Sequence, residues 1–176
     1  MNDPSSQPLY VTSLEEVLWG GLLVAITMTM HGFGMMAVLR VNYTVKNWFK
    51  NKTSLLSGLS PVILASWMIM LVHLTEVAVW AGFFLWQGAF PNRSVAYYFS
   101  LNEYTTVGSN FNLPLHWRLL EGMIATAGLL TFAWSTGILI TLAQEFQDQQ
   151  MQALKQRREK PPTATTPAPD RPARKT

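Results

Sequence analysis

Three long runs of apolar residues constrain this chain more than any other feature. The runs cover residues 18–39, 55–87 and 123–144. His31 in the first run, and His73 and Glu76 in the second, are their only ionisable side chains. Runs of about 20 apolar residues match the ~30 Å hydrocarbon core of a bilayer. A soluble chain of 176 residues can bury one such helix but hardly three, so the sequence predicts an all-α integral membrane protein with three transmembrane helices.

These runs and the polar stretches between them divide the chain into eight segments. In order, we expect an outer N-terminal segment (1–17), a first transmembrane helix (18–39), a basic cytoplasmic loop (40–57), a second transmembrane helix (58–87), a re-entrant pore helix and filter-like loop (88–116), a third transmembrane helix (117–143), a cytoplasmic helix extension (144–160) and a proline-rich disordered tail (161–176).

The distribution of basic residues predicts the orientation. The loop 40–57 has four basic residues and no acidic one, whereas the segment 1–17 has acidic residues and neither Lys nor Arg. The positive-inside rule then places the N-terminus outside and the C-terminus in the cytoplasm. The segment 88–116 accordingly lies on the outer side of the membrane. The basic residues also border membrane spans, so the pI of about 9.3 does not indicate a nucleic-acid partner.

Two absences narrow the functional classes. The chain has no cysteine, which excludes thiolate metal sites, iron–sulfur clusters and disulfides. The N-terminal segment lacks the basic start of a signal peptide, so we expect the first apolar run to be retained as a helix. We expect no enzymatic activity.

The outer segment 88–116 has the pattern of a pore loop. The dipeptide Pro91-Asn92 is a turn signal, and Asn92 or Ser94 can cap a helix. The stretch "SVAYYFSLNEY" then gives about three helical turns, which is too short to span a membrane. Small polar residues follow, and Pro114 precedes the third span. Irregular backbone at membrane depth is tolerated only when buried in protein or lining a water-filled cavity.

The stretch "YYFSLNEYTTVG", followed by "WRLLEGMIATAGLLTFAWSTGILIT", resembles the pore-helix, filter and inner-helix module of tetrameric potassium channels. It is most similar to small bacterial ion-channel proteins of the two-transmembrane class, and the similarity covers residues 89–143. The resemblance implies a homotetramer in the lipid bilayer of a bacterial inner membrane. It also implies passive conduction of a monovalent cation, with K⁺ as the expected ion. It does not identify further membrane partners.

In that family the filter reads TVGYG followed by aspartate, and its backbone carbonyls replace the hydration shell of the ion. Thr106, Val107 and Gly108 match this pattern, and so does Thr105 just before it. By resemblance, the filter uses the carbonyls of residues 105–109 and the Thr106 hydroxyl.

The second half of the filter departs from the family. Ser109 stands where the aromatic residue is expected, Asn110 replaces the second glycine, and Phe111 replaces the aspartate. Asparagine tolerates the left-handed conformation best among non-glycine residues, so Asn110 can replace the glycine at little cost. The replacement of the aromatic residue by Ser109 is therefore the more damaging departure. We expect the vacated space to be filled by Phe111 or by the cluster of Tyr97, Tyr98 and Phe99, and we expect Glu103 to supply a local negative charge. The result is either a cation path with altered selectivity or a pore-like loop that does not conduct.

Two glycines of the third span, Gly128 and Gly137, are candidate hinges. Gly128 lies near the position of the family's gating glycine. Close packing of small residues explains both equally well.

The three ionisable residues of the first two spans form a second candidate site. His73 and Glu76 are spaced i, i+3 on one helix face, and His31 lies at a similar depth. Such groups usually face a bundle interior with a partner. Four interpretations remain open: a structural hydrogen-bonded pair, a proton or pH sensor, a divalent metal site, and a bis-histidine haem between His31 and His73. An alternative function is therefore a metal- or haem-binding membrane subunit with a non-conducting loop.

Overall fold

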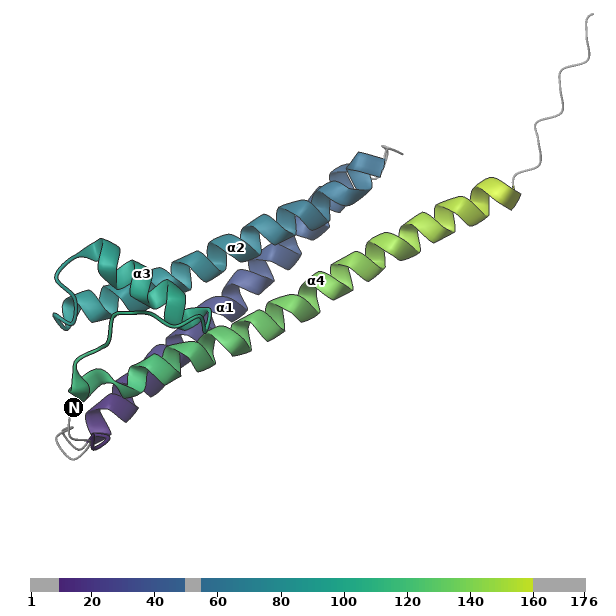
Figure 1. Cartoon of the computed structure of the whole chain (residues 1–176). Helices are drawn as coiled ribbons and strands as arrows, with labels where there is room; N and C mark the ends of the chain where they lie inside the picture. Colours follow the sequence, from purple (N-terminus) through teal and green to yellow (C-terminus); the bar gives the residue numbers. More distant parts are fainter. Residues whose placement is uncertain (1–9, 50–54, 160–176) are drawn as a thin grey trace, which may run out of the picture.

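The computed structural model describes residues 10–49 and 55–159, and within these ranges it contains helices and no strand (Figure 1). Its elements are α1 (Leu14–Phe49), α2 (Leu55–Trp86), α3 (Arg93–Tyr104), the short 3₁₀ helix η2 (Leu115–Trp117) and α4 (Leu119–Glu159). The predicted tail 161–176 and residues 1–9 of the predicted N-terminal segment lie outside the described residues.

Three helices are long and apolar enough to cross a membrane, as the sequence predicts. They cover Leu14–Trp48, Leu59–Trp86 and Leu115–Gln156. A helix suits this role because it satisfies its backbone hydrogen bonds within one segment. α1 has 36 residues and α4 has 41. At 1.5 Å per residue both are much longer than the ~30 Å bilayer core, so each extends beyond it.

The helices extend further than the expected boundaries. Residues 40–49, which we expected to belong to a loop, continue α1, and α2 begins at Leu55. The stretch 40–49 contains neither glycine nor proline, so nothing in it interrupts the helix. The Asn42 side-chain amide donates to the Pro61 carbonyl at 3.0 Å, and Lys46 forms an ion pair with Glu145 of α4.

α1 begins with a capping box. The Glu16 amide donates to the Ser13 hydroxyl oxygen at 3.1 Å, and the Ser13 amide donates to the Glu16 carboxylate at 3.0 Å. The same carboxylate accepts the Leu119 amide at 3.2 Å. Glu16 therefore ties the start of α1 to the start of α4.

α3 lies at one end of the bundle formed by α1, α2 and α4 (Figure 1). Its first turn is capped by Asn92, whose side chain accepts the Val95 amide at 2.9 Å. Phe99 is fully buried and packs against Phe84 and Phe90, with ring centroids 5.5 and 4.8 Å apart. These aromatic contacts hold α3 against the end of α2.

The C-terminal end of α3 reaches deep into the bundle. Tyr104, its last residue, contacts His73, which lies 13 residues before the last residue of α2, Trp86. That contact is made by the hydroxyl at the tip of the side chain. The Tyr104 backbone itself lies against Gly128 of α4, nine residues after Leu119, the first residue of that helix. At 1.5 Å per residue this places the end of α3 about 14 Å from the end of the bundle. The chain then returns to η2 and α4 at the end of the bundle from which it entered (Figure 1). α3 and the following loop thus enter and leave on one side.

α4 approaches this end of α3 closely at Gly128. A Cβ at Gly128 would lie 1.9 Å from the Tyr104 carbonyl oxygen, whereas a Cβ at Gly137 would meet nothing within 4 Å. Gly128 therefore has a packing role, because only a residue without a side chain fits there. A hinge at Gly128 or Gly137 stays a prediction.

We expect Gly128→Ala to destabilise the protein relative to Gly137→Ala. Both substitutions gain about 0.5–1 kcal/mol of helix preference, but only the first forces two backbones apart, at a cost of about 1–3 kcal/mol. Unfolding of the purified protein in detergent measures the difference. Equal stability of the two variants would contradict the close contact.

Candidate functional site

The three ionisable residues predicted to share a site do lie together. His31 of α1 and Glu76 of α2 are joined at 3.0 Å between Nδ1 and Oε1. His73 Nδ1 lies 3.5 Å from the second oxygen, Oε2, of Glu76. One ligand atom from each residue lies within 4.8 Å of the other two, and all three side chains are buried. The prediction of one cluster is confirmed, and both imidazole rings present Nδ1 to the same carboxylate.

Tyr104 joins this cluster from the end of α3, although nothing in the sequence pattern indicates that it does. Its hydroxyl donates to Glu76 Oε2, lies 2.9 Å from His73 Nδ1 and lies 2.6 Å from Thr131 Oγ1 of α4. Tyr104 immediately precedes Thr105, where the predicted filter starts. The cluster is therefore directly connected to the filter-like loop.

Ser135 of α4 closes the opposite side of the cluster. Its hydroxyl oxygen lies 3.0 Å from His73 Nε2 and 3.2 Å from His31 Nε2. Ser135 and Thr131 are spaced i, i+4 on one face of α4. Two hydroxyl residues at this spacing in an apolar run were the signal that could have identified them. All four α-helices thus contribute to the cluster, which we call the polar cluster: His31, His73, Glu76, Tyr104, Thr131 and Ser135.

Aromatic rings surround the polar cluster. The ring of Trp134 lies 5.5 Å from that of His31, and the ring of Phe132 lies 4.5 Å from that of His73. Among the described residues, the only buried side-chain polar atom without a partner is Ser100 Oγ, outside the cluster. The cluster is a closed polar network in apolar surroundings, where an unpaired polar group would be costly.

This arrangement does not fit a bis-histidine haem. The centroids of the His31 and His73 rings are 5.2 Å apart, and Ser135 contacts both Nε2 atoms. A haem iron would need one imidazole on each face of the macrocycle. Here both Nδ1 atoms face one carboxylate and both Nε2 atoms face one hydroxyl, so the two rings do not oppose each other across a space for a macrocycle.

The filter-like loop begins as a helix cap. The Thr106 amide donates to the Glu103 carbonyl and the Val107 amide to the Asn102 carbonyl, both at 2.9 Å. These two bonds form a Schellman motif. Thr106 takes the left-handed position usually given to glycine, with φ 61°. A β-branched residue is a real outlier there, and the conformation costs about 1–2 kcal/mol.

The rest of the loop is exposed and is held by a few local contacts. Val107 is 75% exposed, and Gly108 has φ 81°. The Ser109 hydroxyl oxygen accepts the Phe111 amide at 3.0 Å. In this single chain the carbonyls of residues 105–109 do not form an enclosed path, because such a path needs several copies around an axis.

The three residues expected to support the filter have different roles. Phe111 packs edge-on against Tyr98 of α3, with centroids 6.2 Å apart. The Glu103 carboxylate accepts a hydrogen bond from the Ser109 backbone, and burial and the charge of Glu121 raise the pKa of Glu103 above its ordinary value. Phe99 packs toward α2, so it supports α3 and not the loop itself.

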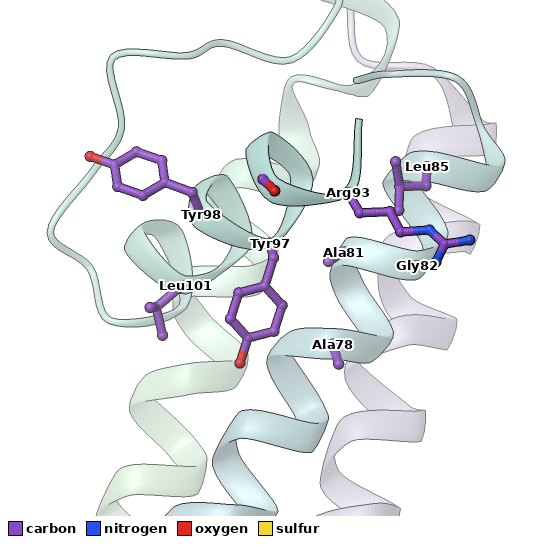
Figure 2. Close-up of a pocket in the computed structure, with 9 residues that line it drawn as sticks. Ala78, Ala81, Gly82, Leu85, Arg93, Tyr97, Tyr98 and Leu101 are labelled. Atoms are coloured by element: carbon purple, nitrogen blue, oxygen red, sulfur yellow. The ribbon is translucent and has the colours of Figure 1, made fainter. Parts of the chain in front are cut away.

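A separate groove lies between α2 and α3 on the outer face of the bundle (Figure 2). Figure 2 shows the ring of Tyr97 directed along α2 and that of Tyr98 directed away from it. The groove has a volume of about 610 Å³. It is lined by Ala78, Ala81, Gly82, Leu85, Arg93, Ser94, Tyr97, Tyr98 and Leu101. The groove shares no residue with the polar cluster.

Comparisons with known proteins leave the function to be argued from this geometry. No protein-family model matches the chain, and no curated protein and no solved structure matches it.

We expect Tyr104→Phe to destabilise the protein by about 1–3 kcal/mol, because Glu76 and Thr131 lose a buried hydrogen-bond partner. Tyr98→Phe is the matched control, since Tyr98 is half exposed and surface substitutions usually change stability by less than about 0.5 kcal/mol. Denaturant unfolding in detergent measures both. If the two variants were equally stable, the Tyr104 hydroxyl would not anchor α3.

Proposed function

We propose that this chain is the pore-forming subunit of a homotetrameric cation channel in a bacterial inner membrane. It conducts monovalent cations passively, with a preference for K⁺, through an altered filter formed by residues 105–110. One observation carries the proposal. A short helix between two long apolar helices ends level with Gly128 of α4, about 14 Å inside the bundle, and turns directly into the "TTVGSN" loop, which returns to the same end.

The orientation of α3 favours a cation at its inner end. The helix has 12 residues, and the last carbonyls of a helix carry the negative end of its dipole. Because α3 ends inside the bundle, this negative end faces the interior and the positive end faces outward. A cation leaving water gains favourable electrostatics at that position.

The conformation of the loop supports the same role. Thr106 occupies a strained left-handed position in the single chain, and strained backbone is concentrated at functional sites. The strain falls on the residue that the resemblance assigns to the filter hydroxyl. In a tetramer the loops of four subunits surround one axis, and Thr106 exchanges its cap for ion coordination.

The departures from the family pattern define the expected selectivity. Ser109 is too small to brace the loop as an aromatic residue would, and Phe111 packs on Tyr98, outside that position. The filter is consequently wider or more compliant than one with an aromatic at 109. Cation selectivity is retained through the backbone carbonyls, while the preference for K⁺ over Na⁺ is reduced.

The topology follows from the charge distribution. The basic segment between the first two spans lies in the cytoplasm together with the C-terminal half of α4, and the N-terminus lies outside. The filter-like loop then opens to the outer side. The lipid bilayer and three further copies of the chain are the partners.

Cation flux into liposomes tests this function. Tetrameric protein in liposomes is expected to pass K⁺ faster than empty vesicles do, to pass Na⁺ at a measurable rate, and to exclude a large organic cation. Flux no greater than that of empty vesicles, from protein shown to be tetrameric, would rule out conduction.

In the same assay, we expect Ser109→Tyr combined with Asn110→Gly to raise the K⁺/Na⁺ flux ratio about tenfold, which corresponds to about 1.4 kcal/mol of discrimination. The added aromatic braces the loop, and the glycine relieves the backbone at 110. Ser66→Tyr, at an exposed position on α2, is the control and leaves the ratio unchanged. An unchanged ratio in the double variant would count against residues 105–110 as the filter.

A further inference from the structure

We propose that the polar cluster is a structural binding site for a divalent transition-metal ion of the zinc class. The ligands are His31 Nδ1, His73 Nδ1, the Glu76 carboxylate and the Tyr104 oxygen, whose proton, donated to Glu76 in the metal-free chain, is released to solvent when the ion binds. This inference does not depend on ion conduction, because the site lies among the helices and not in the filter-like loop.

The spacing of the four ligand groups suits a tetrahedral ion. His31 Nδ1 lies 3.0 Å from Glu76 Oε1, and His73 Nδ1 lies 3.5 Å from Glu76 Oε2 and 2.9 Å from the Tyr104 oxygen. Zinc bonds of about 2.0–2.1 Å place tetrahedral ligands about 3.3 Å apart. These three distances scatter around this value, and the ligand atoms of His31, His73 and Glu76 all lie within 4.8 Å of one another. The Tyr104 oxygen and Glu76 Oε2 are closer, because they share a hydrogen bond, so these two groups must move apart when the ion binds.

The hydrogen bonds of Ser135 support ligation through Nδ1. Its hydroxyl oxygen lies 3.0 and 3.2 Å from the two Nε2 atoms, and a hydroxyl has one hydrogen and two lone pairs. If both rings were neutral and protonated on Nδ1, both Nε2 atoms would need a donor, and Ser135 can supply only one. When both Nδ1 atoms bind a metal, both Nε2–H groups donate to the two lone pairs of Ser135.

This is the outer-shell pattern of metal-bound histidine, whose free ring N–H donates to a fixed acceptor. Two metal-free arrangements also satisfy the network. One has a single imidazolium facing Glu76, and the other has two neutral rings of opposite tautomer, with the Ser135 hydroxyl accepting from one Nε2–H and donating to the other Nε2. One protonated ring is enough to neutralise one carboxylate, however. The second ring, that of His73, also presents its Nδ1 to Glu76. A metal ion bound by two histidine nitrogens and Glu76 requires both Nδ1 atoms to face the carboxylate.

The donor types select the ion. Two imidazole nitrogens and two kinds of oxygen suit Zn²⁺ and similar borderline ions. Ca²⁺ requires six to eight oxygen ligands, more than this site offers, and the chain has no cysteine for soft thiolate sites. Four protein ligands leave no open position, which is typical of a structural site and not a catalytic one.

The ion would join three helices at one point. His31 comes from α1, His73 and Glu76 from α2, and Tyr104 from the end of α3. Because Tyr104 directly precedes the filter-like loop, metal binding fixes the start of that loop to the first two spans. Loss of the ion is expected to loosen the loop before it unfolds the bundle.

Metal analysis of the purified protein tests the proposal. The full chain is purified in detergent through a tag without histidine, incubated with Zn²⁺, desalted and analysed by mass spectrometry of its metals. We expect about one Zn²⁺ per chain and a lower unfolding temperature after treatment with a chelator. Substitution by Co²⁺ is expected to give the visible absorption of a tetrahedral site.

The control uses the third histidine of the chain. His116→Gln, at an exposed position on η2, is expected to bind Zn²⁺ like the wild type, whereas His31→Gln is expected to lose it. Should His31→Gln fail to fold, Ser135→Ala serves instead, because it removes only the acceptor behind the ligands and is expected to weaken Zn²⁺ binding about 10- to 100-fold. Folded wild-type protein that holds no Zn²⁺ after loading, with an unfolding temperature insensitive to chelator, would overturn the site and leave a metal-free hydrogen-bonded network.

Discussion

The hydrogen bonds of the Tyr104 hydroxyl are the contact on which the rest of the arrangement depends. This one group joins Glu76 and His73 of α2 to Thr131 of α4. It does so from the last residue of α3, a helix too short to be stable by itself. The aromatic packing of Phe99 and the hydrogen bond from the Tyr97 hydroxyl to the Leu74 carbonyl hold α3 against α2, and the Tyr104 contacts fix where its end lies. The depth of the filter-like loop follows from them.

The same region shows why polar groups in apolar surroundings occur as a set. A lone carboxylate there would be costly, and Glu76 is tolerated because His31 and Tyr104 bond to it. Gly128 lets α4 approach the end of α3, three residues before Thr131, which contacts the Tyr104 hydroxyl. Packing and polar pairing are therefore coupled, and a substitution at Gly128 is expected to change the hydrogen bonds of the polar cluster. This coupling connects the proposed metal site to the proposed pore without making either depend on the other.

Much of the architecture could be predicted from the sequence. Three apolar runs of the right length appear as three long helices, Asn92 caps the short helix between the last two, and the i, i+3 spacing places His73 and Glu76 on one face. These features are local or periodic, so they can be read without knowing the fold. The helix ends were less predictable, because residues 40–49 carry charge but contain nothing that stops a helix.

The chain by itself determined which segments are helical and which polar residues lie in apolar runs, since hydrogen bonding within a helix and the period of 3.6 residues act locally. Only the tertiary structure decided the partners. The position of α3 between α2 and α4 decides these contacts. It brings Tyr104, Thr131 and Ser135 to His31, His73 and Glu76. It also turns Phe99 toward α2 and makes Gly128 a contact point. Residues 27 to 104 positions apart in the sequence make these contacts. No local pattern encodes such distances, because they arise from the packing of whole helices.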